Sequence, residues 1–569
     1  MPTIDVSKKD LEKLVKKKFD LSSLEYLKAS FSADEKNSDL LHVELKDVNR
    51  PDLWSTEGIA RELKSHLGFT KGIPKYSFLE QKQHYVVNVA NKVKKVRPPI
   101  IACAVVLNLK LDDNAIFQLI QLQEKLCESF GRKRKEASMG VYDFDKIKWP
   151  ITYTTFKPNE LKFIPLGMNE EMTLKDILLK HEKGKQYGHL IEKSDEYPVI
   201  LDSSNNVLSM PPVINSEYTG KVTSDTKNVF IEVTGTSERF VLPVLNIMVS
   251  ALAERGGDIV KVRIKKGKIM KKEHITPDFT PAEFRININS VNDCLGLNLN
   301  AKEMDDLLEK SGFNVKKKEK DFIIIEVPSW RQDVMSETDI IEDIAINYGY
   351  SNFDTEMPKI PTIGKTTDLN NFIKKISNLL TGLGSQEIAT FSLTNKDVIF
   401  KNMRAKPEQV VEISNPISLN YSCLRISILP SVIEWLSSNK DARYGQNVFE
   451  IGSAIKIENS EAVEKTKLCF AISDTKTNFT DIKKVLDWLF SCLGLNCRIN
   501  QKDFDCFIEG RAGEIIVSKN AGAKSKTLSE CHLGSVGEIH PAVLEKFNIV
   551  MPIAAFELDL SELMSALKL

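Results

Sequence analysis

The sequence predicts a multidomain α+β protein, and three observations carry this prediction. At 569 residues the chain is too long for a single hydrophobic core. One stretch of loop and helix occurs twice, near residue 50 and near residue 331. The region between the two copies mixes helical and strand patterns. We expect small α+β domains at 1–79 and 273–355, an α/β domain at 80–272 and a larger last domain at 356–569.

Composition narrows the class of protein. The 78 Lys and Arg residues balance 78 Asp and Glu residues, so the chain does not resemble a protein that holds nucleic acid by overall charge. The nine cysteines are odd in number and lack zinc-site spacing, which predicts reduced thiols and a cytoplasmic location. We find no signal-peptide pattern and no apolar run of about 18 residues, and therefore expect neither secretion nor a membrane span.

The first domain contains two predicted helices. In the first, at 7–18, Leu11, Leu14 and Val15 face inward. Its opposite face is rich in lysine, which could contact RNA phosphates or could be an ordinary solvated face. An NRPD loop at 49–52 then leads into the second helix, for which Ser55 is a suitable N-cap.

A basic run in the second domain is a candidate nucleic-acid contact. GRKRK at 131–135 follows an amphipathic helix pattern at 115–130 and precedes Tyr142 and Phe144. Positive charge beside aromatic rings suits contact with nucleic acid, although runs of this length are also common on ordinary surfaces. The residues leave both interpretations open.

A polar strand end in the same domain is a candidate pocket. Short strand patterns at 197–201 and 229–233 flank the loop VLSMPPVINSE, whose paired prolines predict a rigid loop beside a cleft. Glu232 and Thr234 alternate with apolar residues and therefore project from one strand face. A carboxylate beside a hydroxyl suits a polar pocket, and a solvent-facing strand side is the alternative.

The third domain carries an acidic cluster on a predicted helix. Ser336 and Asp339 form a capping-box pattern, and Asp339, Glu342 and Asp343 lie on one helical face, with Asp333 in the entry loop. An oxygen-seeking cation such as Mg²⁺ would relieve the repulsion among these carboxylates. The alternative is that the helix dipole favours acids in a first turn without any metal. The apolar positions at helical spacing are Ile340, Ile341, Ile344, Ala345 and Tyr348.

The internal repeat bears on that choice. The stretch at 50–69 aligns without a gap on 331–350, and it has Gly58 and Arg61 at the positions of Asp339 and Glu342. If the acids served only the fold, both copies could be expected to need them. This contrast favours a separate task, such as metal binding, for the second copy.

Two motifs resemble those of a known family. They are DVNRPDLWSTEGIARELK at 47–64 and VPSWRQDVMSETDIIEDIAINYGY at 327–350. Both are similar to the β subunit of phenylalanyl-tRNA synthetase in its archaeal and eukaryotic cytosolic form. Further similarity extends the resemblance over essentially the whole chain, at 389–398, 413–436, 446–452 and 532–547.

The resemblance implies an editing domain at 80–272 that hydrolyses tyrosine wrongly esterified to tRNA(Phe). A pocket built for a phenylalanine ring discriminates against an added hydroxyl by only about 100-fold, so a second, polar pocket is needed. We expect Glu232 or Ser209 to hydrogen-bond the tyrosine phenol while Thr234 and backbone groups position a water. The residues that match the family's pocket are Ile200, Ser209, Glu232 and Thr234, with Asn215 and Glu217 on the adjoining loop.

For the third domain, the resemblance implies that Asp333, Asp339, Glu342 and Asp343 bind a Mg²⁺ ion shared with a catalytic α subunit. The small domains are similar in shape to DNA-binding domains. That similarity is an analogy, and we expect no DNA ligand.

For the last domain, the resemblance implies an antiparallel sheet like that of a class II synthetase. The glycine-rich third signature with its ATP-binding arginine is absent, as are class I signatures and a Walker loop. ATP would therefore be used by the α subunit of a two-α, two-β heterotetramer that charges tRNA(Phe), and Asn415 and Arg425 would serve packing and the interface. The alternatives are a free-standing editing hydrolase and a non-catalytic nucleic-acid-binding protein.

Overall fold

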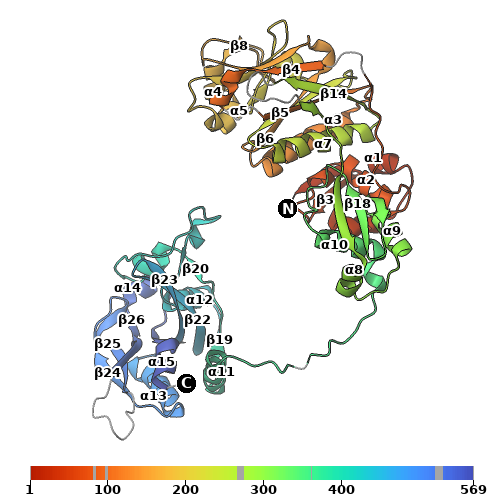
Figure 1. Ribbon diagram of the computed structural model, residues 1–569. Helices are drawn as coiled ribbons and strands as arrows, with labels where there is room; N and C mark the ends of the chain where they lie inside the picture. Colours follow the sequence, from red (N-terminus) through yellow and green to blue (C-terminus); the bar gives the residue numbers. More distant parts are fainter. Residues whose placement is uncertain are drawn as a thin grey trace. The chain divides into compact units, whose positions relative to one another are not determined.

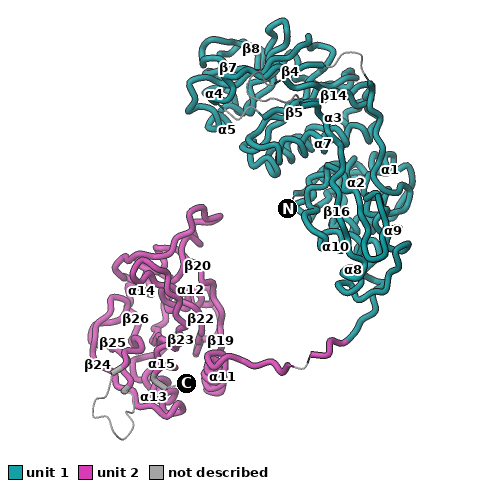
Figure 2. The backbone as a smooth tube through the Cα atoms, in the orientation of Figure 1, with its two compact units in different colours: residues 1–356 teal, residues 357–569 magenta. Residues whose placement is uncertain are grey.

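The computed structural model describes residues 2–80, 85–96, 100–265, 274–360, 362–518 and 530–567. The chain separates into two compact units, residues 1–356 and 357–569 (Figure 2). The expected domain boundary at 272–273 and the basic segment after Lys265 lie outside the described residues. Among the helices that are described, none has both the length and the apolar character needed to cross a bilayer.

Two small domains in the first unit have the same element order. In the first, the strands form a three-stranded antiparallel sheet in the order β1-β3-β2, and in the second they form one in the order β16-β18-β17. The whole domain is therefore repeated, beyond the helix and loop that the sequence suggested. The elements of the first domain are β1 (Thr3–Ser7), α1 (Lys8–Val15), a 3-10 helix (Leu21–Leu27), β2 (Ala29–Ala33), β3 (Leu40–Leu45) and α2 (Thr56–His66). Those of the second are β16 (Ala282–Asn287), α8 (Ile288–Leu295), α9 (Ala301–Lys310), where the first domain has the 3-10 helix, β17 (Asn314–Lys318), β18 (Phe322–Val327) and α10 (Glu337–Tyr348).

The predicted caps begin the helices of these domains. Ser55 accepts a hydrogen bond from the Gly58 amide at the start of α2, and Ser336 and Asp339 cap α10 reciprocally. Gly58 is required by a close approach, because a Cβ there would lie 1.9 Å from the Asp52 carbonyl oxygen. The glycine at this position of the first copy thus has a steric reason, independent of any metal in the second copy.

The domain between the repeats is built on a mixed ten-stranded sheet. Its order is β12-β11-β10-β7-β4-β14-β5-β13-β6, with β15 beside β14, and α7 packs on β5, β13 and β6 (Figure 1). In the described residues only β4 pairs in parallel, with β7 and with β14, so the expected α/β class is wrong for this mostly antiparallel domain. The strands are β4 (Tyr85–Val89), β5 (Ile100–Leu107), β6 (Ala137–Asp143), β7 (Ile151–Phe156), β10 (Tyr197–Leu201), β11 (Val207–Met210), β12 (Ile214–Asn215), β13 (Val229–Gly235), β14 (Asp258–Lys265) and β15 (His274–Thr276).

The end strands of this sheet, β12 and β6, approach each other. Asn215 on β12 donates from Nδ2 to the Val141 carbonyl on β6, 3.5 Å away, and its Oδ1 lies 3.4 Å from the Tyr142 hydroxyl. Side chains therefore connect β12 and β6, which do not pair through their backbones, and the sheet forms a near-barrel. We call this junction between β12 and β6 the seam. The helices of the domain are α3 (Asp113–Lys125) with a π-helical turn (Leu126–Phe130), α4 (Leu174–Lys180), α5 (Glu182–Tyr187), α6 (Glu217–Gly220) and α7 (Glu238–Glu254); a small hairpin pairs β8 (Lys162–Phe163) with β9 (Met172–Thr173).

The second unit is a seven-stranded sheet in the order β19-β22-β23-β27-β26-β25-β24, antiparallel except for β19. Two apolar clusters pack on it, one including α12 and the other including α11, α13 and α15. The multidomain α+β class is thereby confirmed. The elements are α11 (Asp368–Gly382), β19 (Gln386–Glu387), β20 (Leu393–Thr394), β21 (Cys423–Leu424), α12 (Leu429–Ser438), β22 (Gln446–Glu458), β23 (Glu461–Ser473), α13 (Phe479–Cys492), β24 (Cys497–Gln501), β25 (Phe507–Ser518), β26 (Glu530–Ile539), α14 (Pro541–Lys546), β27 (Ile553–Asp559) and α15 (Leu560–Leu567).

Candidate functional site

A pocket of about 330 Å³ opens at the seam of the near-barrel. Its walls come from α3, β6, the loop after β11, and β12. Glu232, Ser209 and Asn215, three of the six predicted pocket residues, line it. Strand β13, which carries Glu232, pairs with β5 on one side and β6 on the other, and the residue is only 2% exposed.

The other three predicted residues lie behind or beside the pocket. Ile200 is fully buried and pairs with Ser209 across β10 and β11. Thr234 is also fully buried, and its hydroxyl lies 3.0 Å from that of Ser138, which does line the pocket. Glu217 does not line the pocket; its carboxylate accepts a hydrogen bond from the Gly167 amide and pairs with Lys221, which does line it.

Tyr142 is a neighbour of the pocket, and the sequence offered it as one candidate for contact with nucleic acid. It is fully buried, so the suggestion that its ring stacks on nucleic acid is wrong. Its hydroxyl donates to Glu232 Oε1 at 3.0 Å, and Ser209 lies beside the same phenol. Burial raises the pKa of Tyr142 well above its ordinary value, so the phenol remains a hydrogen-bond donor. The sequence signal for this role is Gly140, because a glycine two positions before a strand tyrosine leaves room for the tyrosine ring beside it.

Arg134 from the basic run holds the pocket loop. Its Nη1 donates to the carbonyls of Pro212 at 3.3 Å and Val213 at 2.9 Å, and its guanidinium lies 4.0 Å from the centre of the Tyr187 ring. This residue of GRKRK is thus used for structure, whereas Arg132 remains exposed. Lys183 and Lys221 add positive charge to the lining, which suits a substrate that carries phosphates.

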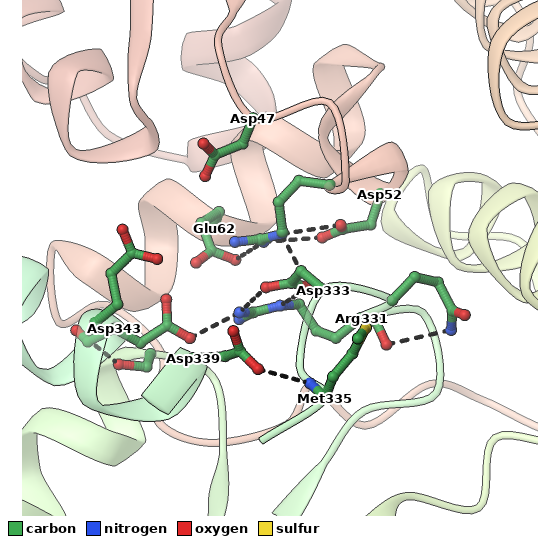
Figure 3. A network of polar contacts seen from close by, with 12 residues as sticks. Asp47, Asp52, Glu62, Arg331, Asp333, Met335, Asp339 and Asp343 are labelled. Atoms are coloured by element: carbon green, nitrogen blue, oxygen red, sulfur yellow. Dashed lines mark hydrogen bonds and ion pairs between the residues drawn. The ribbon is translucent and has the colours of Figure 1, made fainter. Parts of the chain in front are cut away.

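All four predicted metal-binding acids line a second pocket, between the two repeated domains. Arg331 donates to Asp333 through Nε (2.8 Å) and Nη2 (2.6 Å) and to Asp343 through Nη2 (2.7 Å), as Figure 3 shows. Glu342 pairs with Lys28, and Asp339 caps the amides of Met335 and Ser336. Burial opposes ionisation of Asp333, but Arg331 and Arg50 lower its pKa to about 2, whereas burial raises the pKa of Asp343.

The first repeat contains the same arginine clamp. Arg50 donates to Asp52 through Nε and Nη2 and to Glu62 through Nη2. Each of these residues is displaced from its counterpart in the second clamp by the 281 residues that also separate the hydrogen-bonded pair His66 and Asn347. A contact between equivalent residues is typical of a two-fold pairing, so the domains pair as a pseudo-dimer.

The pairing of the two repeats shows which acids are particular to the second one. Asp333 and Asp343 have acidic counterparts in the first copy, so only Asp339 and Glu342 are special to the second. Arg61, at the position of Glu342, is buried and donates to Ser250 on α7, so packing explains its presence. In the part of the chain that the structure describes, no three His, Cys, Asp or Glu side chains are already arranged to hold a metal ion.

The second unit has a large open pocket of about 890 Å³ near β20 and β21. Phe391 and Leu419 line it and are mostly exposed, and the neighbouring Ile417 is fully exposed. Exposed apolar side chains gathered in this way are typical of an interaction surface. Arg425 is instead buried and pairs with Glu450 at 2.8 Å, whereas Asn415 is exposed.

Comparison with known proteins identifies the family. Three family models match: the B3/4 domain at residues 83–262, the tRNA synthetase B5 domain at 284–350 and the phenylalanyl tRNA synthetase beta chain CLM domain at 354–560. The phenylalanine–tRNA ligase beta subunit of Pyrococcus horikoshii is 45% identical over 573 residues, which cover 99% of this chain and all of that one. The chain belongs to the archaeal type of the phenylalanyl-tRNA synthetase β-subunit family.

More distant members of the family also match over the full length. The phenylalanine–tRNA ligase beta subunit of Methanococcus aeolicus is 35% identical over 577 residues, covering 98% of this chain and 100% of that one. A crystal structure of an N-terminal fragment of the Pyrococcus horikoshii β subunit superimposes with a TM-score of 0.58 at 46% identity, over 61% of this chain and 100% of the fragment. Membership in the synthetase family confirms the predicted resemblance and disfavours both alternative functions.

Proposed function

We propose that this β subunit hydrolyses mischarged tRNA(Phe) and binds the α subunit, while the α subunit performs the ATP-dependent charging of tRNA(Phe). The domain at 80–272 would hydrolyse Tyr-tRNA(Phe), and the domain at 356–569 would bind the α subunit in a cytoplasmic two-α, two-β heterotetramer. The observation that carries the editing role is the seam pocket, with the buried Glu232 carboxylate in its wall and lysines in its lining.

The pocket residues suggest how a tyrosyl ester would be distinguished. The substrate phenol can donate a hydrogen bond to Glu232 or Ser209, whereas a phenylalanyl ring cannot and would leave these polar groups without the bond. Ser138, backed by Thr234, is available to orient a water molecule. Water then adds to the ester carbonyl and the carbon–oxygen bond to the terminal ribose breaks, which releases tyrosine and restores the ribose hydroxyl.

The test uses the holoenzyme and preformed Tyr-tRNA(Phe). We expect Glu232→Ala to lower the deacylation rate at least about tenfold, because a hydrogen bond to a charged group is lost. Phenylalanine charging by the same preparation should be unchanged, which controls for folding. Glu182→Ala, at an exposed acid of α5 that does not line the pocket, is the matched control and should retain most of the activity. An unchanged deacylation rate in Glu232→Ala would rule out this role.

Mg²⁺ is proposed for the second pocket. Six carboxylates line it, against the cations Lys28 and Arg50 in its lining and Arg331 behind, so negative charge is in excess. An all-oxygen donor set with excess negative charge fits a hard cation. We assign the ion to Asp333, Asp339, Glu342 and Asp343, where it would neutralise charge and stabilise the contact with the α subunit.

Bound Mg²⁺ can be measured directly by equilibrium dialysis of the holoenzyme. We expect the double variant Asp339→Asn with Glu342→Gln to lose the ion, because these two acids are not held by an arginine clamp. Asp306→Asn, which removes an exposed acid of α9, is the control. Equal Mg²⁺ content in the double variant and the parent would refute the assignment.

The α-subunit partner is proposed for the second unit. Its sheet resembles a class II catalytic fold but the chain lacks the catalytic signatures, and the apolar side chains around Ile417 are exposed. Co-expression with a candidate α subunit should yield a complex that charges tRNA(Phe). If the chain by itself exchanged pyrophosphate into ATP in the presence of phenylalanine, this division of roles would be refuted.

A further inference from the structure

Tyr142 connects the strands that meet at the seam pocket. Its hydroxyl lies 3.0 Å from Glu232 Oε1 on β13 and 3.4 Å from Asn215 Oδ1 on β12. A phenol has one hydrogen to donate, and the shorter distance assigns it to Glu232. Asn215 in turn donates to the backbone of β6. One buried hydroxyl is therefore in contact with both sides of the pocket.

Gly140 makes this arrangement possible. On β6 it pairs directly with Glu232, and Tyr142 lies two residues further on the same face. A Cβ at position 140 would lie 2.1 Å from the Tyr142 hydroxyl oxygen. The ring therefore folds back along its own strand, over the glycine, to reach the carboxylate. The ring also stacks near Phe230, with ring centres 5.7 Å apart.

We propose that Tyr142 is a positioning residue for editing, whose hydroxyl orients the Glu232 carboxylate so that the pocket binds a tyrosyl ester in preference to a phenylalanyl ester. This inference rests on the proposed editing function. The bond from Tyr142 fixes one oxygen of the carboxylate, Oε1, and thereby helps to set the direction in which the carboxylate faces in the pocket wall. Preference for tyrosyl over phenylalanyl esters then depends on a hydroxyl that does not itself line the pocket.

Tyr142→Phe in the holoenzyme tests the proposal, because it removes the hydroxyl and keeps the ring packed near Phe230. We expect hydrolysis of preformed Tyr-tRNA(Phe) to fall about tenfold or more, which is the range for loss of a hydrogen bond to a charged group. Hydrolysis of preformed Phe-tRNA(Phe) should stay within about twofold of the parent rate, because the phenylalanyl ring has no hydroxyl to bond to Glu232. The ratio of the two rates, rather than either rate, is the readout of positioning.

A matched control removes an equivalent bond elsewhere. Tyr76 donates its hydroxyl to Glu254 Oε1 at 2.7 Å, and neither residue lines the seam pocket. Tyr76→Phe thus loses the same kind of phenol–carboxylate bond, and it should leave the Tyr/Phe ratio unchanged. Gly140→Ala is a second test, because its new methyl group must displace the Tyr142 hydroxyl, and it should lower the ratio as Tyr142→Phe does.

The pH dependence of editing adds an independent readout. The bond from Tyr142 stabilises the ionised form of Glu232, so its loss should move the acid limb of the rate profile to higher pH. The ionisable groups around Glu232 are Tyr142 on β6, Cys103 on β5 and, in the lining, Glu124, Arg134, Lys183 and Lys221.

Each outcome decides the matter. A lower Tyr/Phe ratio in Tyr142→Phe and in Gly140→Ala, with Tyr76→Phe unchanged, would support the positioning role. An unchanged ratio in Tyr142→Phe, or equal falls in editing and in phenylalanine charging, would overturn it. If the parent holoenzyme did not hydrolyse Tyr-tRNA(Phe), the proposed function itself would fail, and this inference with it.

Discussion

Arg331 joins Asp333 and Asp343, and its replacement gives a sharp test of the clamp in the second repeat. Its side chain is 2% exposed and makes three hydrogen bonds to the two carboxylates. Arg331→Met keeps most of the apolar stem but leaves both carboxylates buried in place. The charge effect is therefore separated from loss of packing.

The expected cost follows from the contacts. Removing one partner of a buried ion pair costs about 3–5 kcal/mol, because the remaining charge has no compensation. Here Arg50 Nε stays 3.7 Å from Asp333 and compensates part of that charge, so we expect a loss near the lower end, about 3 kcal/mol. Lys28→Met is the comparison: its pair with Glu342 is 30% and 52% exposed, and we expect about 0–1 kcal/mol.

Hydrogen exchange of the α10 amides measures this difference locally, without assuming that the whole chain unfolds in one step. The free energy of opening of α10 should fall by about 3 kcal/mol in Arg331→Met and change little in Lys28→Met. Adding Asp343→Asn should recover at least about 1 kcal/mol by removing one uncompensated charge. Equal protection in both single variants would refute the clamp as the source of stability.

Three further predictions concern other parts of the chain. Glu557 accepts hydrogen bonds at the start of α12 and from Lys467, which lower its pKa against the effect of burial, so Glu557→Gln should cost about 2 kcal/mol at neutral pH in urea unfolding of the second unit. Arg134→Met should release the loop that it holds, increase hydrogen exchange of that loop and slow Tyr-tRNA(Phe) hydrolysis about tenfold. Ile417→Asp should leave the second unit folded and prevent co-purification with the α subunit.

These predictions have internal controls. Because folding lowers the pKa of Glu557, the stability that its carboxylate contributes is present above about pH 4.5 and is lost as the pH falls through the folded-state pKa. Glu557→Gln should therefore make the stability of the second unit depend less on pH in this range. An equally steep loss of stability in acid would contradict this prediction. Arg239→Met, at an exposed arginine of α7 that does not line the pocket, should leave editing unchanged. A stable complex with Ile417→Asp would place the interface elsewhere.

Local patterns predicted those features that depend on neighbours in sequence. The caps at Ser55 and Ser336 and the apolar face of α10 follow from residues within one or two helical turns, and the structure has them. The alternation around Glu232 also predicted a strand with this carboxylate on one face. Whether that face met solvent or a pocket could not be predicted, because β13 acquires its neighbours from strands about 90 and 130 residues away.

The acidic cluster also shows what local sequence patterns cannot predict. The helical spacing of Asp339, Glu342 and Asp343 was correct, but spacing cannot say which cation compensates them. Arg331 is close in sequence, whereas Lys28 comes from the other repeat, 314 residues away. The steric reason for Gly58 was likewise hidden, because it depends on the path of the preceding turn.

The sequence alone determined the family, the multidomain α+β class, the repeated helix and loop, and the chemical types of residue at both candidate sites, since each of these is encoded in local order and composition. Tertiary structure decided that the repeat is a paired domain, that the sheet curls into a near-barrel, and that Tyr142 holds Glu232 instead of meeting nucleic acid. The physical reason is that burial, hydrogen-bond partners and charge compensation depend on residues brought together from distant parts of the chain.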